Sequence, residues 1–319
     1  MKAILVCLGI ALSFGACKKT GTGGGGGGGG GGSGGWLVGT NGMMVNVLTT
    51  GESRTYPLDS QATLNAIACR GYVGEAWVAG SGGTLLYTND AGASWRPQAV
   101  PTDADLRAIA TQDSGPVFVA GDGVLLTSSD TGQHWTALGD GTLSFAAIAA
   151  AQNAETVLAV SEDGALFAVE SGQLVGRGSF TGARALAVSP DGQTALVVGD
   201  HLIARSSDGG RSWTPLANTP DARFDAVRLD EDGQAIAVGS TGAVAHISAA
   251  GDVAMQQVGT VALHAIHIAD PDDGEVAAGF AGGDDGRVFI TLDGGATWRD
   301  GPRVGRTVLG LDMIGRGHL

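Results

Sequence analysis

From residue 36 onward the sequence repeats one unit about every 40 residues, and this repetition constrains the fold more than any other feature. Each unit has a short alternating strand, a turn such as Ser189-Pro190-Asp191-Gly192, a second apolar strand, and then two more strands. The predicted first strands begin 38 to 45 residues apart, at Leu64, Leu106, Phe145, Ala183, Phe224, Leu263 and Val308. Four short strands in each unit, without a helical period, predict the radial blades of a β-propeller.

The two ends of the repeat region supply incomplete units. The C-terminal end offers only a first strand, from Val308 to Ile314, and the N-terminal end starts with a second strand at Trp36. Pairing the C-terminal strand with the three N-terminal strands completes a blade and protects the sheet edges. We therefore predict an all-β domain over residues 36–319. It is a seven-bladed β-propeller of four-stranded antiparallel blades, closed by this pairing.

One turn motif recurs between the third and fourth strands, with the pattern Ser/Thr-x-Asp-x-Gly-x-x-Trp, known as the Asp-box. Its four copies, at 88–95, 128–135, 206–213 and 291–298, contain four of the six tryptophans. The Asp can accept turn N–H groups, the Gly permits a positive φ, and the Trp can pack between blades. We therefore predict a structural and not a catalytic role for Asp90, Gly92, Trp95, Asp130, Gly132, Trp135, Asp208, Gly210, Trp213, Asp293, Gly295 and Trp298. The units at 145–182 and 224–262 and the shared blade have lost the box.

These motifs give residues 36–319 a resemblance to a known family. Leu64-x-x-Ile67, followed by Trp77-Val78-Ala79-Gly80 and an Asp-box, is similar to the repeat of the photosystem II assembly and stability factors. That family lies in the WD40/YVTN/BNR-like repeat superfamily. The resemblance implies an exported seven-bladed protein that binds other proteins, assists assembly and has no catalytic activity. The acidic charge and glycine-rich segment of this chain depart from the photosynthetic members, so no photosystem partner is implied.

The N-terminal segment is predicted to contain a targeting signal followed by a flexible linker. Residues 1–16 combine a positive start with a short apolar run, typical of a signal peptide. Phe14-Gly15-Ala16-Cys17 resembles the lipobox of bacterial lipoproteins, although Phe14 replaces the usual Leu, so Cys17 is the predicted lipidation site. Residues 17–35 then form a glycine-rich flexible linker. The predicted location is the bacterial cell envelope, lipid-anchored to the outer membrane on its periplasmic side or at the cell surface. The alternative is ordinary secretion.

Charge and cysteine content exclude several partners. The formal net charge is −14 and the pI is about 4.6, which argues against nucleic acid and against docking on anionic lipid through a basic surface. We therefore predict contact with the membrane through the lipid anchor only. Once Cys7 is removed and Cys17 is lipidated, Cys69 is left alone and is predicted to be a small core residue.

The sequence gives little sign of catalysis. A sialidase, which also carries Asp-boxes, needs an Arg-Ile-Pro motif and a late tyrosine, but this motif does not occur and the last tyrosine is Tyr87. His264 and His267 do not form a metal motif on a strand. Asp270 to Glu275 lacks full calcium-loop spacing, so a hairpin turn is favoured. We predict no enzyme activity, no cofactor and no metal site. A glycosidase with two carboxylates stays open as the less favoured alternative.

The face opposite the Asp-boxes is the candidate binding surface, because propellers usually bind around the channel mouth. The turns between second and third strands contribute acidic residues, and the starts of the first strands add charged ones. The candidate residues are Arg107, Asp122, Asp163, Arg184, Asp200, Asp225, His264, Asp284 and Asp285. Such a rim could capture a basic protein segment or a divalent ion. The alternative is that these polar loops are simply solvated.

The sequence therefore predicts a non-enzymatic, envelope-anchored propeller that acts as a protein-binding or assembly module. Its predicted partner is an envelope or secreted protein, and the chain is expected to be a monomer. A cell-surface glycan-binding propeller is the main alternative. Few aromatic residues are left outside the Asp-boxes to stack on sugars, which favours a protein partner.

Overall fold

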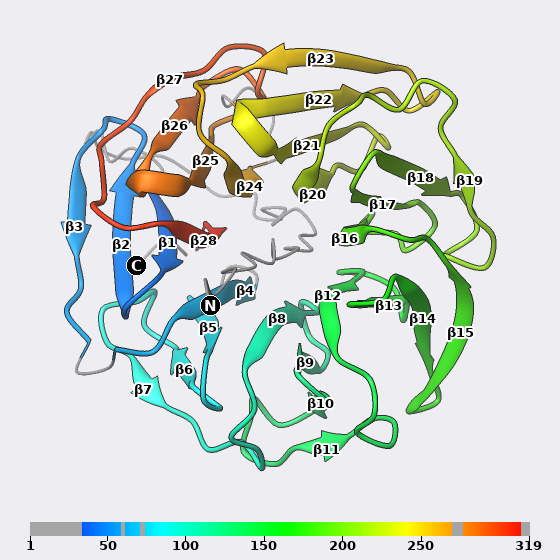
Figure 1. Ribbon diagram of the computed structural model, residues 1–319. Helices are drawn as coiled ribbons and strands as arrows, with labels where there is room; N and C mark the ends of the chain where they lie inside the picture. Colours follow the sequence, from blue (N-terminus) through cyan, green and yellow to red (C-terminus); the bar gives the residue numbers. More distant parts are fainter. Residues whose placement is uncertain (1–33, 59–60, 71–73, 270–276, 314–319) are drawn as a thin grey trace, which may run out of the picture.

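The structure is a computed structural model that describes residues 34–58, 61–70, 74–269 and 277–313. Their strands form seven four-stranded antiparallel sheets set radially around a common centre (Figure 1). The predicted seven-bladed propeller is therefore confirmed. The predicted signal peptide, Cys17, residues 17–33 of the linker and the turn at Asp270–Glu275 lie outside the described residues.

The strands of each blade follow one another from the centre outward, and blades 1 to 7 are numbered in chain order. The innermost strands are β4 (Leu64–Arg70), β8 (Leu106–Thr111), β12 (Phe145–Ala150), β16 (Ala183–Val188), β20 (Phe224–Leu229), β24 (Leu263–Ile268) and β28 (Val308–Asp312). The second strands are β5 (Glu75–Gly80), β9 (Val117–Gly121), β13 (Val157–Ser161), β17 (Ala195–Gly199), β21 (Ala235–Gly239), β25 (Gly279–Gly283) and β1 (Gly34–Gly39).

The outer half of each blade follows the same order. The third strands are β6 (Leu85–Thr88), β10 (Val124–Ser128), β14 (Ala165–Glu170), β18 (Leu202–Ser206), β22 (Ala243–Ile247), β26 (Val288–Thr291) and β2 (Met43–Leu48). The outermost strands are β7 (Arg96–Pro97), β11 (Thr136–Ala137), β15 (Gln173–Ser179), β19 (Thr214–Pro215), β23 (Val253–Gln257), β27 (Arg299–Asp300) and β3 (Ser53–Thr55). Two 3-10 turns, η2 (Ser240–Gly242) and η3 (Asp284–Gly286), join second and third strands.

The ring closes through blade 7, whose strand order is β28-β1-β2-β3. Trp36 of β1 pairs with Asp312 of β28, so the last described strand joins the first. This confirms the predicted closure, and every innermost strand begins at the predicted residue. β1 also includes Gly34 and Gly35, which the sequence placed in the linker. A Cβ on Gly35 would lie 2.8 Å from the ring of Phe280, so glycine lets β1 pass this ring.

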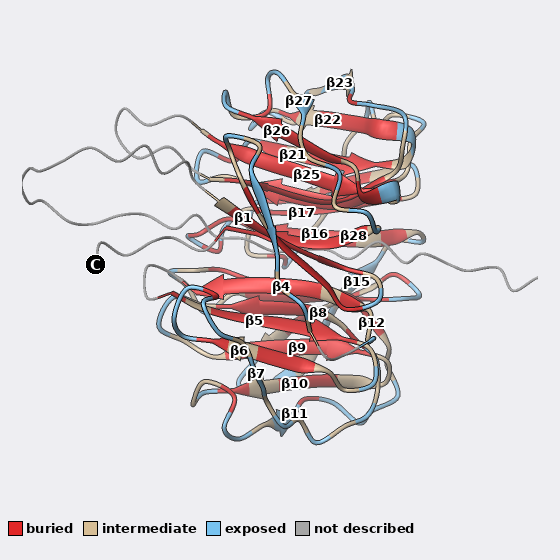
Figure 2. Cartoon of the chain, turned by 90° about the vertical axis from the view of Figure 1, so that its left-hand side faces the viewer, coloured by how far each residue is buried: buried red, intermediate tan, exposed pale blue. Residues whose placement is uncertain are grey.

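The core is made by the inner strands, which are buried, while exposed residues gather at the turns and the outermost strands (Figure 2). Blades converge toward the centre, so the space between neighbouring innermost strands is small. The third residue of each innermost strand is accordingly alanine or glycine, and each alanine is at most 1% exposed: Ala66, Ala108, Ala147, Ala185, Ala226, Ala265 and the equivalent Gly310. Leucine, isoleucine and valine at the following position fill the wider space between the blades.

The Asp-box turns are held by a compact set of hydrogen bonds. In blade 1 the Thr88 hydroxyl donates to Asp90 Oδ1 (2.7 Å) and accepts the Gly92 N–H (3.0 Å). Asp90 also accepts the Ser94 N–H (2.9 Å), and the equivalent bonds occur in the other three boxes. The Ser94 hydroxyl and N–H, followed by the Thr88 hydroxyl, lower the pKa of Asp90 to about 2.

Each box glycine also receives a side chain from the preceding blade. A Cβ on Gly92 would lie 2.2 Å from Trp36 of blade 7, and one on Gly295 would lie 2.6 Å from Ile236 of blade 5. Both glycines have a positive φ, 82° and 92°. The box glycine therefore meets two requirements at once, a left-handed backbone and a close contact between blades. Trp95 adds an edge-on contact with Trp36, with 5.5 Å between ring centroids.

Outermost strands differ in length according to the Asp-box. The four boxed blades have outermost strands of two residues, whereas β15, β23 and β3 of the unboxed blades have seven, five and three. The box turn occupies chain that would otherwise pair with the third strand, which shortens the edge. The unboxed blades therefore expose longer backbone edges at the rim.

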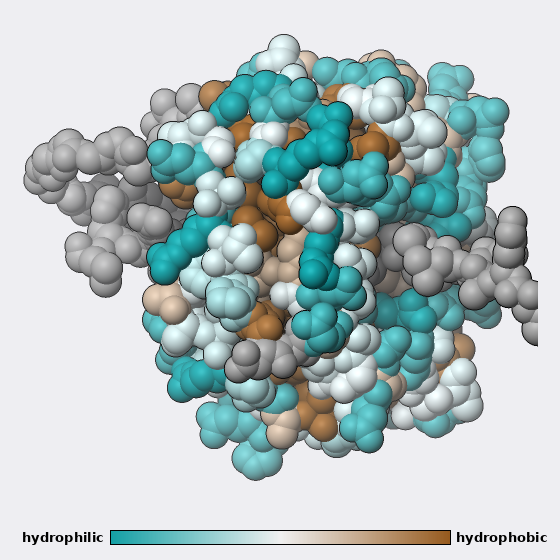
Figure 3. Space-filling model, turned by 60° about the vertical axis from the view of Figure 1, so that its left-hand side comes forward, coloured by the Kyte–Doolittle hydropathy of each residue, from teal (hydrophilic) through white to brown (hydrophobic). Residues whose placement is uncertain are grey.

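The outer surface seen in Figure 3 is mostly hydrophilic, with narrow strips of apolar residues between polar ones. In the described part of the chain, the large apolar side chains that are exposed are Met255 (48%) and Leu292 (47%). None of the helices in this part has the length and apolar composition needed to cross a membrane.

A close backbone approach explains the glycine that ends most second strands. A Cβ on Gly239 would lie 1.8 Å from the carbonyl oxygen of Arg223, which also accepts the Ser240 N–H (2.9 Å). Five other second strands end in glycine with the same contact at 1.9 to 2.5 Å: Gly39, Gly80, Gly121, Gly199 and Gly283. Blade 3 differs, because Ser161 occupies this place. The reason for glycine is contact, since φ of Gly239 is −171° and suits any residue.

We expect Gly239→Ala to lower the free energy of unfolding by about 1–3 kcal/mol, because the added methyl group forces the β21 end away from Arg223. Urea unfolding followed by circular dichroism measures this change. The matched control is Gly176→Ala in β15, where nothing lies within 4 Å of the added Cβ and φ is not positive. Equal stability losses in the two variants would contradict the steric explanation.

Candidate functional site

The turns between second and third strands, together with the starts of the innermost strands, form one side of the ring, which we call the mouth face. The Asp-box turns, between third and fourth strands, lie on the opposite side, because successive turns of an antiparallel blade alternate between its two ends. The structure therefore separates the two predicted sets of residues. The nine candidate binding residues fall on the mouth face, and the twelve Asp-box residues fall on the other.

Arg107 is fixed on the mouth face by carboxylates of two blades. Its Nε donates to Asp122 Oδ1 (2.6 Å) and its Nη2 to Asp122 Oδ2 (3.0 Å), a bidentate pair. Nη2 also lies 3.4 Å from Glu162 of blade 3. Burial opposes the charge, but the bonds to Asp122 outweigh it and raise the pKa of Arg107. The guanidinium is thus a permanent, oriented cation between blades 2 and 3.

Arg184 of blade 4 repeats this arrangement with Asp200. Nε donates to Oδ1 (2.9 Å) and Nη2 to Oδ2 (3.0 Å), and both side chains are partly exposed. The hydrogen bonds to Asp200 are the main reason that the pKa of Arg184 is raised. Among the described residues, Nη1 of Arg107 and Nη1 of Arg184 have no hydrogen-bond partner. Each guanidinium therefore keeps one donor group for a bound molecule.

Asp225, His264 and Asp284 form a third cluster, which joins blades 5 and 6. His264 Nε2 lies 2.9 Å from Asp284 Oδ1, and its Nδ1 lies 3.3 Å from Asp225 Oδ2. The side chain of Asp225 is 0% exposed and that of His264 is 2% exposed. Arg223 Nη2 donates to the same Asp225 oxygen (2.9 Å). Burial disfavours the imidazolium, but the close carboxylates of Asp225 and Asp284 outweigh it and raise the pKa of His264.

These pairs all come from the same two positions of a blade. The second residue of the innermost strand lies at a shift in the strand register. In blades 2, 4 and 6 its side chain contacts the side chain of the first residue after the second strand. Arg107–Asp122, Arg184–Asp200 and His264–Asp284 are the three cases. The arginine or histidine of each pair comes from the centre of the ring and the carboxylate from the turn.

The two other predicted acidic residues lie apart from these pairs. Asp163 serves its own turn, where it accepts the Ser161 hydroxyl (2.5 Å), and this bond, followed by the Ala165 N–H, lowers its pKa. Asp285 is exposed at the tip of η3 with a φ of 56°. On the mouth face, Asp122 and Asp200 each hold an arginine of the same chain, and Asp284 holds His264.

Sequence reasoning missed Arg223, which precedes β20 and neutralises Asp225. The Arg223-Phe224-Asp225 spacing was the available signal, since alternate residues of an extended segment share a face. Within the described ranges, no group of three His, Cys, Asp or Glu side chains is arranged to hold a metal ion. The arrangement is suited to fixed charge recognition.

Comparisons with known proteins place the N-terminal part of the chain near one family. Residues 31–175 match the family model described as photosynthesis system II assembly factor YCF48. This match confirms the resemblance noted in the sequence. No curated protein matches the chain.

Solved structures with similar folds include two YCF48 propellers. YCF48 from Cyanidioschyzon merolae is 19% identical, with a TM-score of 0.61 over 79% of this chain and 88% of that chain. A YCF48 bound to a D1 peptide is also 19% identical, with a TM-score of 0.62 over 84% of this chain and 88% of that one. A GH74 enzyme from Niastella koreensis is 17% identical, with a TM-score of 0.63, over 80% of this chain and 43% of the enzyme. At these identities the likeness shows the shared propeller fold.

The His264 cluster predicts a pH-dependent stability. Because the folded pKa of His264 is raised above 6.5, its contribution is fully present below the unfolded pKa and is lost as pH rises through the folded value. We expect the melting temperature of the protein to exceed that of His264→Gln most at about pH 5.5, and the gap to narrow toward about pH 9. Thermal unfolding of both proteins across this range tests it. A gap that widens with pH would contradict the assignment.

Proposed function

We propose that this chain is an envelope-anchored propeller that binds a protein segment on its mouth face and assists assembly. The observation that carries the proposal is the set of charged residues held in place there, Arg107–Asp122, Arg184–Asp200 and His264 between two carboxylates. The match of residues 31–175 to an assembly-factor family supports it. So does the fold likeness to a propeller that was solved with a bound peptide.

Prearranged ion pairs favour recognition of a polypeptide. Their side chains are already ordered, so binding a partner costs less conformational entropy than ordering free arginines would. Charged groups in fixed positions also select the register of the partner and exclude wrong ones. With a net charge of −14, the chain attracts segments that are basic overall. Carboxylates of such a segment can accept hydrogen bonds from Nη1 of Arg107 and of Arg184.

The proposal involves no catalysis. Asp122 and Asp200 on the mouth face are each held in a bidentate pair with an arginine, so their oxygens are engaged within the chain. A glycosidase needs one carboxyl group that stays protonated near neutral pH beside an ionised one. The likeness to a GH74 enzyme concerns the fold and assigns no such pair.

The proposed envelope location rests on the first residues of the chain. Residues 1–16 have the features of a signal peptide, and Cys17 follows small residues as in a lipobox. The sixteen residues 18–33, most of them glycine, would give the propeller a reach of roughly 20–24 Å from the lipid. The proposed protein is a monomer that uses this freedom to meet an envelope or secreted partner.

We expect a mouth-face variant, Arg107→Gln, Asp122→Asn, Arg184→Gln and Asp200→Asn, to lose partner capture by at least about tenfold. Each pair is replaced by two uncharged amides, and because the side chains are partly exposed, folding should be preserved. A photo-cross-linking residue at position 285 in the full-length protein, expressed in its native cells, would report the partner by mass spectrometry.

The matched control is Glu170→Gln with Arg177→Gln, which removes one ion pair at the rim of blade 3. This variant should capture the same partner as the unmodified protein. Capture that survives in the mouth-face variant, or that is lost equally in the control, would contradict the proposed surface.

The anchor is tested separately with Cys17→Ser. We expect this variant to lose its N-terminal lipid and to move from the membrane fraction to the soluble fraction, because the acyl chains supply its membrane affinity. Intact-mass spectrometry and cell fractionation measure both effects. A variant that stays in the membrane fraction would show that the anchor lies elsewhere.

A further inference from the structure

Strand β23 is a long, uncharged strand at the outer edge of blade 5. It ends the sheet order β20-β21-β22-β23 and runs along the rim of the ring (Figure 1). Its sequence, Val-Ala-Met-Gln-Gln over residues 253–257, contains no charge, glycine or proline. Met255 is 48% exposed. Natural proteins usually protect such edges with charges, prolines or short length.

Other outermost strands in the described ranges are protected in these ways. Four of them have two residues, and two of those four end in proline, at Pro97 and Pro215. β3 has three residues and carries Arg54. β15 is longer, but it contains Arg177, which is paired with Glu170, and two glycines. Among these outermost strands, β23 is therefore the one that is both longer than three residues and without charged residues.

The hydrogen bonds at its two ends show which backbone groups of β23 point outward. The Ser248 N–H donates to the Asp252 carbonyl (2.9 Å), and the Val258 N–H donates to the Gly242 carbonyl (2.8 Å). Bonded pairs alternate along an antiparallel ladder, so Ala254 and Gln256 bond to β22. The N–H and C=O groups of residues 253, 255 and 257 then face outward. An extended chain is the structure whose groups match this spacing.

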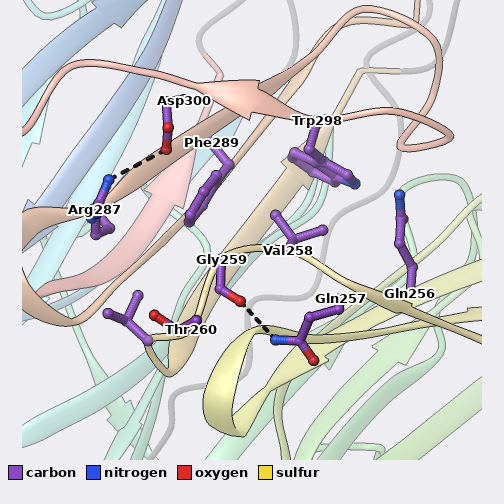
Figure 4. A pocket seen from close by; sticks show the side chains of 10 residues that line it. Gln256, Gln257, Val258, Gly259, Thr260, Arg287, Phe289, Trp298 and Asp300 are labelled. Atoms are coloured by element: carbon purple, nitrogen blue, oxygen red, sulfur yellow. Dashed lines mark hydrogen bonds and ion pairs between the residues drawn. The ribbon is translucent and has the colours of Figure 1, made fainter.

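Two pockets that could receive side chains of a bound segment lie beside the same edge. Gln256 points toward blade 6, where its Nε2 donates to the Ala296 carbonyl (3.1 Å). It lines a pocket of ≈ 430 Å³ whose walls include Phe289 and Trp298 (Figure 4). Ala254, on the same side of the strand, lines a second pocket of ≈ 440 Å³ with Ile236 and Ile268. Two positions of an added strand, separated by one residue, would thus face these pockets, the second of which is mainly apolar and the first of which offers Phe289 and Trp298 among polar groups.

Charges at the two ends of the edge limit what can bind. Asp252 is exposed beside its start, and Asp300, whose side chain is 71% exposed, lies beside the pocket at its end. Arg287 contacts Asp300 at 3.3 Å and is the cation of that pocket. The outer edge therefore combines a neutral centre with an exposed carboxylate at its start and an ion pair at its end, on a chain whose net charge is −14, which complements a peptide that is apolar in the middle and basic at its ends.

We propose that the edge of β23 binds an extended segment of a partner protein as a fifth strand of blade 5. Residues of that segment opposite Ala254 and Gln256 are apolar and face the two pockets. Residues opposite Val253, Met255 and Gln257 form the backbone hydrogen bonds. Lysine or arginine on either side of the segment lies near Asp252 and Asp300. This surface is distinct from the mouth face and does not depend on it.

The probe is a fluorescein-labelled, end-blocked peptide, Lys-Thr-Val-Thr-Val-Thr-Lys, titrated with the full-length protein and followed by anisotropy. Its valines are placed to face the pockets, and its threonine amides to bond to β23. We expect N-methylation of the threonine amides to weaken binding at least tenfold, and N-methylation of the valine amides to leave it unchanged. Hydrogen exchange at the amides of residues 253, 255 and 257 should slow when the peptide binds.

Protein variants complete the test. Met255→Lys adds a charge to the edge, and Met255→Pro removes an outward N–H without breaking the pairing with β22. Both should weaken binding at least tenfold, whereas the matched control Leu292→Lys, at an equally exposed apolar residue, should not. The mouth-face variant should bind the peptide normally, which separates this proposal from the proposed function.

Three results would overturn the proposal. The first is the absence of binding by the unmodified peptide, and the second is equal binding of the two N-methylated peptides. The third is a dimer in sedimentation velocity that Met255→Lys dissociates, which would assign the edge to a second copy of the chain. Urea midpoints of the variants within the error of the unmodified protein confirm that folding is intact.

Discussion

The convergence of seven innermost strands on one centre is the constraint on which the rest of the structure depends. Near the centre there is room between strands for a methyl group and little more, and the third residue of each innermost strand is alanine or, in β28, Gly310. A Cβ on Gly310 would already lie 3.0 Å from the Cα of Ala66 and 2.7 Å from Val38. Because the blades widen outward, larger side chains and finally the Asp-box tryptophans fill the growing space. The order of residue sizes along each unit follows from this geometry.

Closure of the ring links the first, sixth and seventh blades through one buried side chain. Asp312, in the last described strand, is 2% exposed and contacts blades on both sides. Its Oδ2 accepts the Cys69 N–H of blade 1 (2.6 Å), and its Oδ1 lies 3.1 Å from His267 of blade 6. A buried carboxylate is costly unless it is bonded, so Asp312 is satisfied only when blades 6, 7 and 1 are all in place. Cys69 accordingly belongs to the core, as its alternating strand predicted.

Much of the fold could be predicted because its signals are local and repeated. Each innermost strand begins where the pattern of apolar residues places it, from Leu64 to Val308, and the incomplete ends predicted the pairing of β28 with β1. The pairs on the mouth face could not be predicted in the same way. Arg107 and Asp122 are 15 residues apart, and His264 meets Asp225 of another blade, so their contact depends on how blades are rotated. The sequence therefore identified charged residues but not that they neutralise one another.

Loss of the Asp-box has a structural consequence that the sequence alone does not show. A box holds its turn against the preceding blade and leaves two residues to pair as an outermost strand, as in β7 and β27. Blade 5 retains only a trace of the box, in which the Ser248 hydroxyl still accepts the Asp252 N–H (3.0 Å), and Met255 occupies the sequence position of the missing tryptophan. The freed chain extends β23 and leaves space against blade 6. Degeneration of a structural motif thus produces an open edge with two adjoining pockets, while the mouth face, set by the innermost strands, keeps its charges whether or not the blade carries a box.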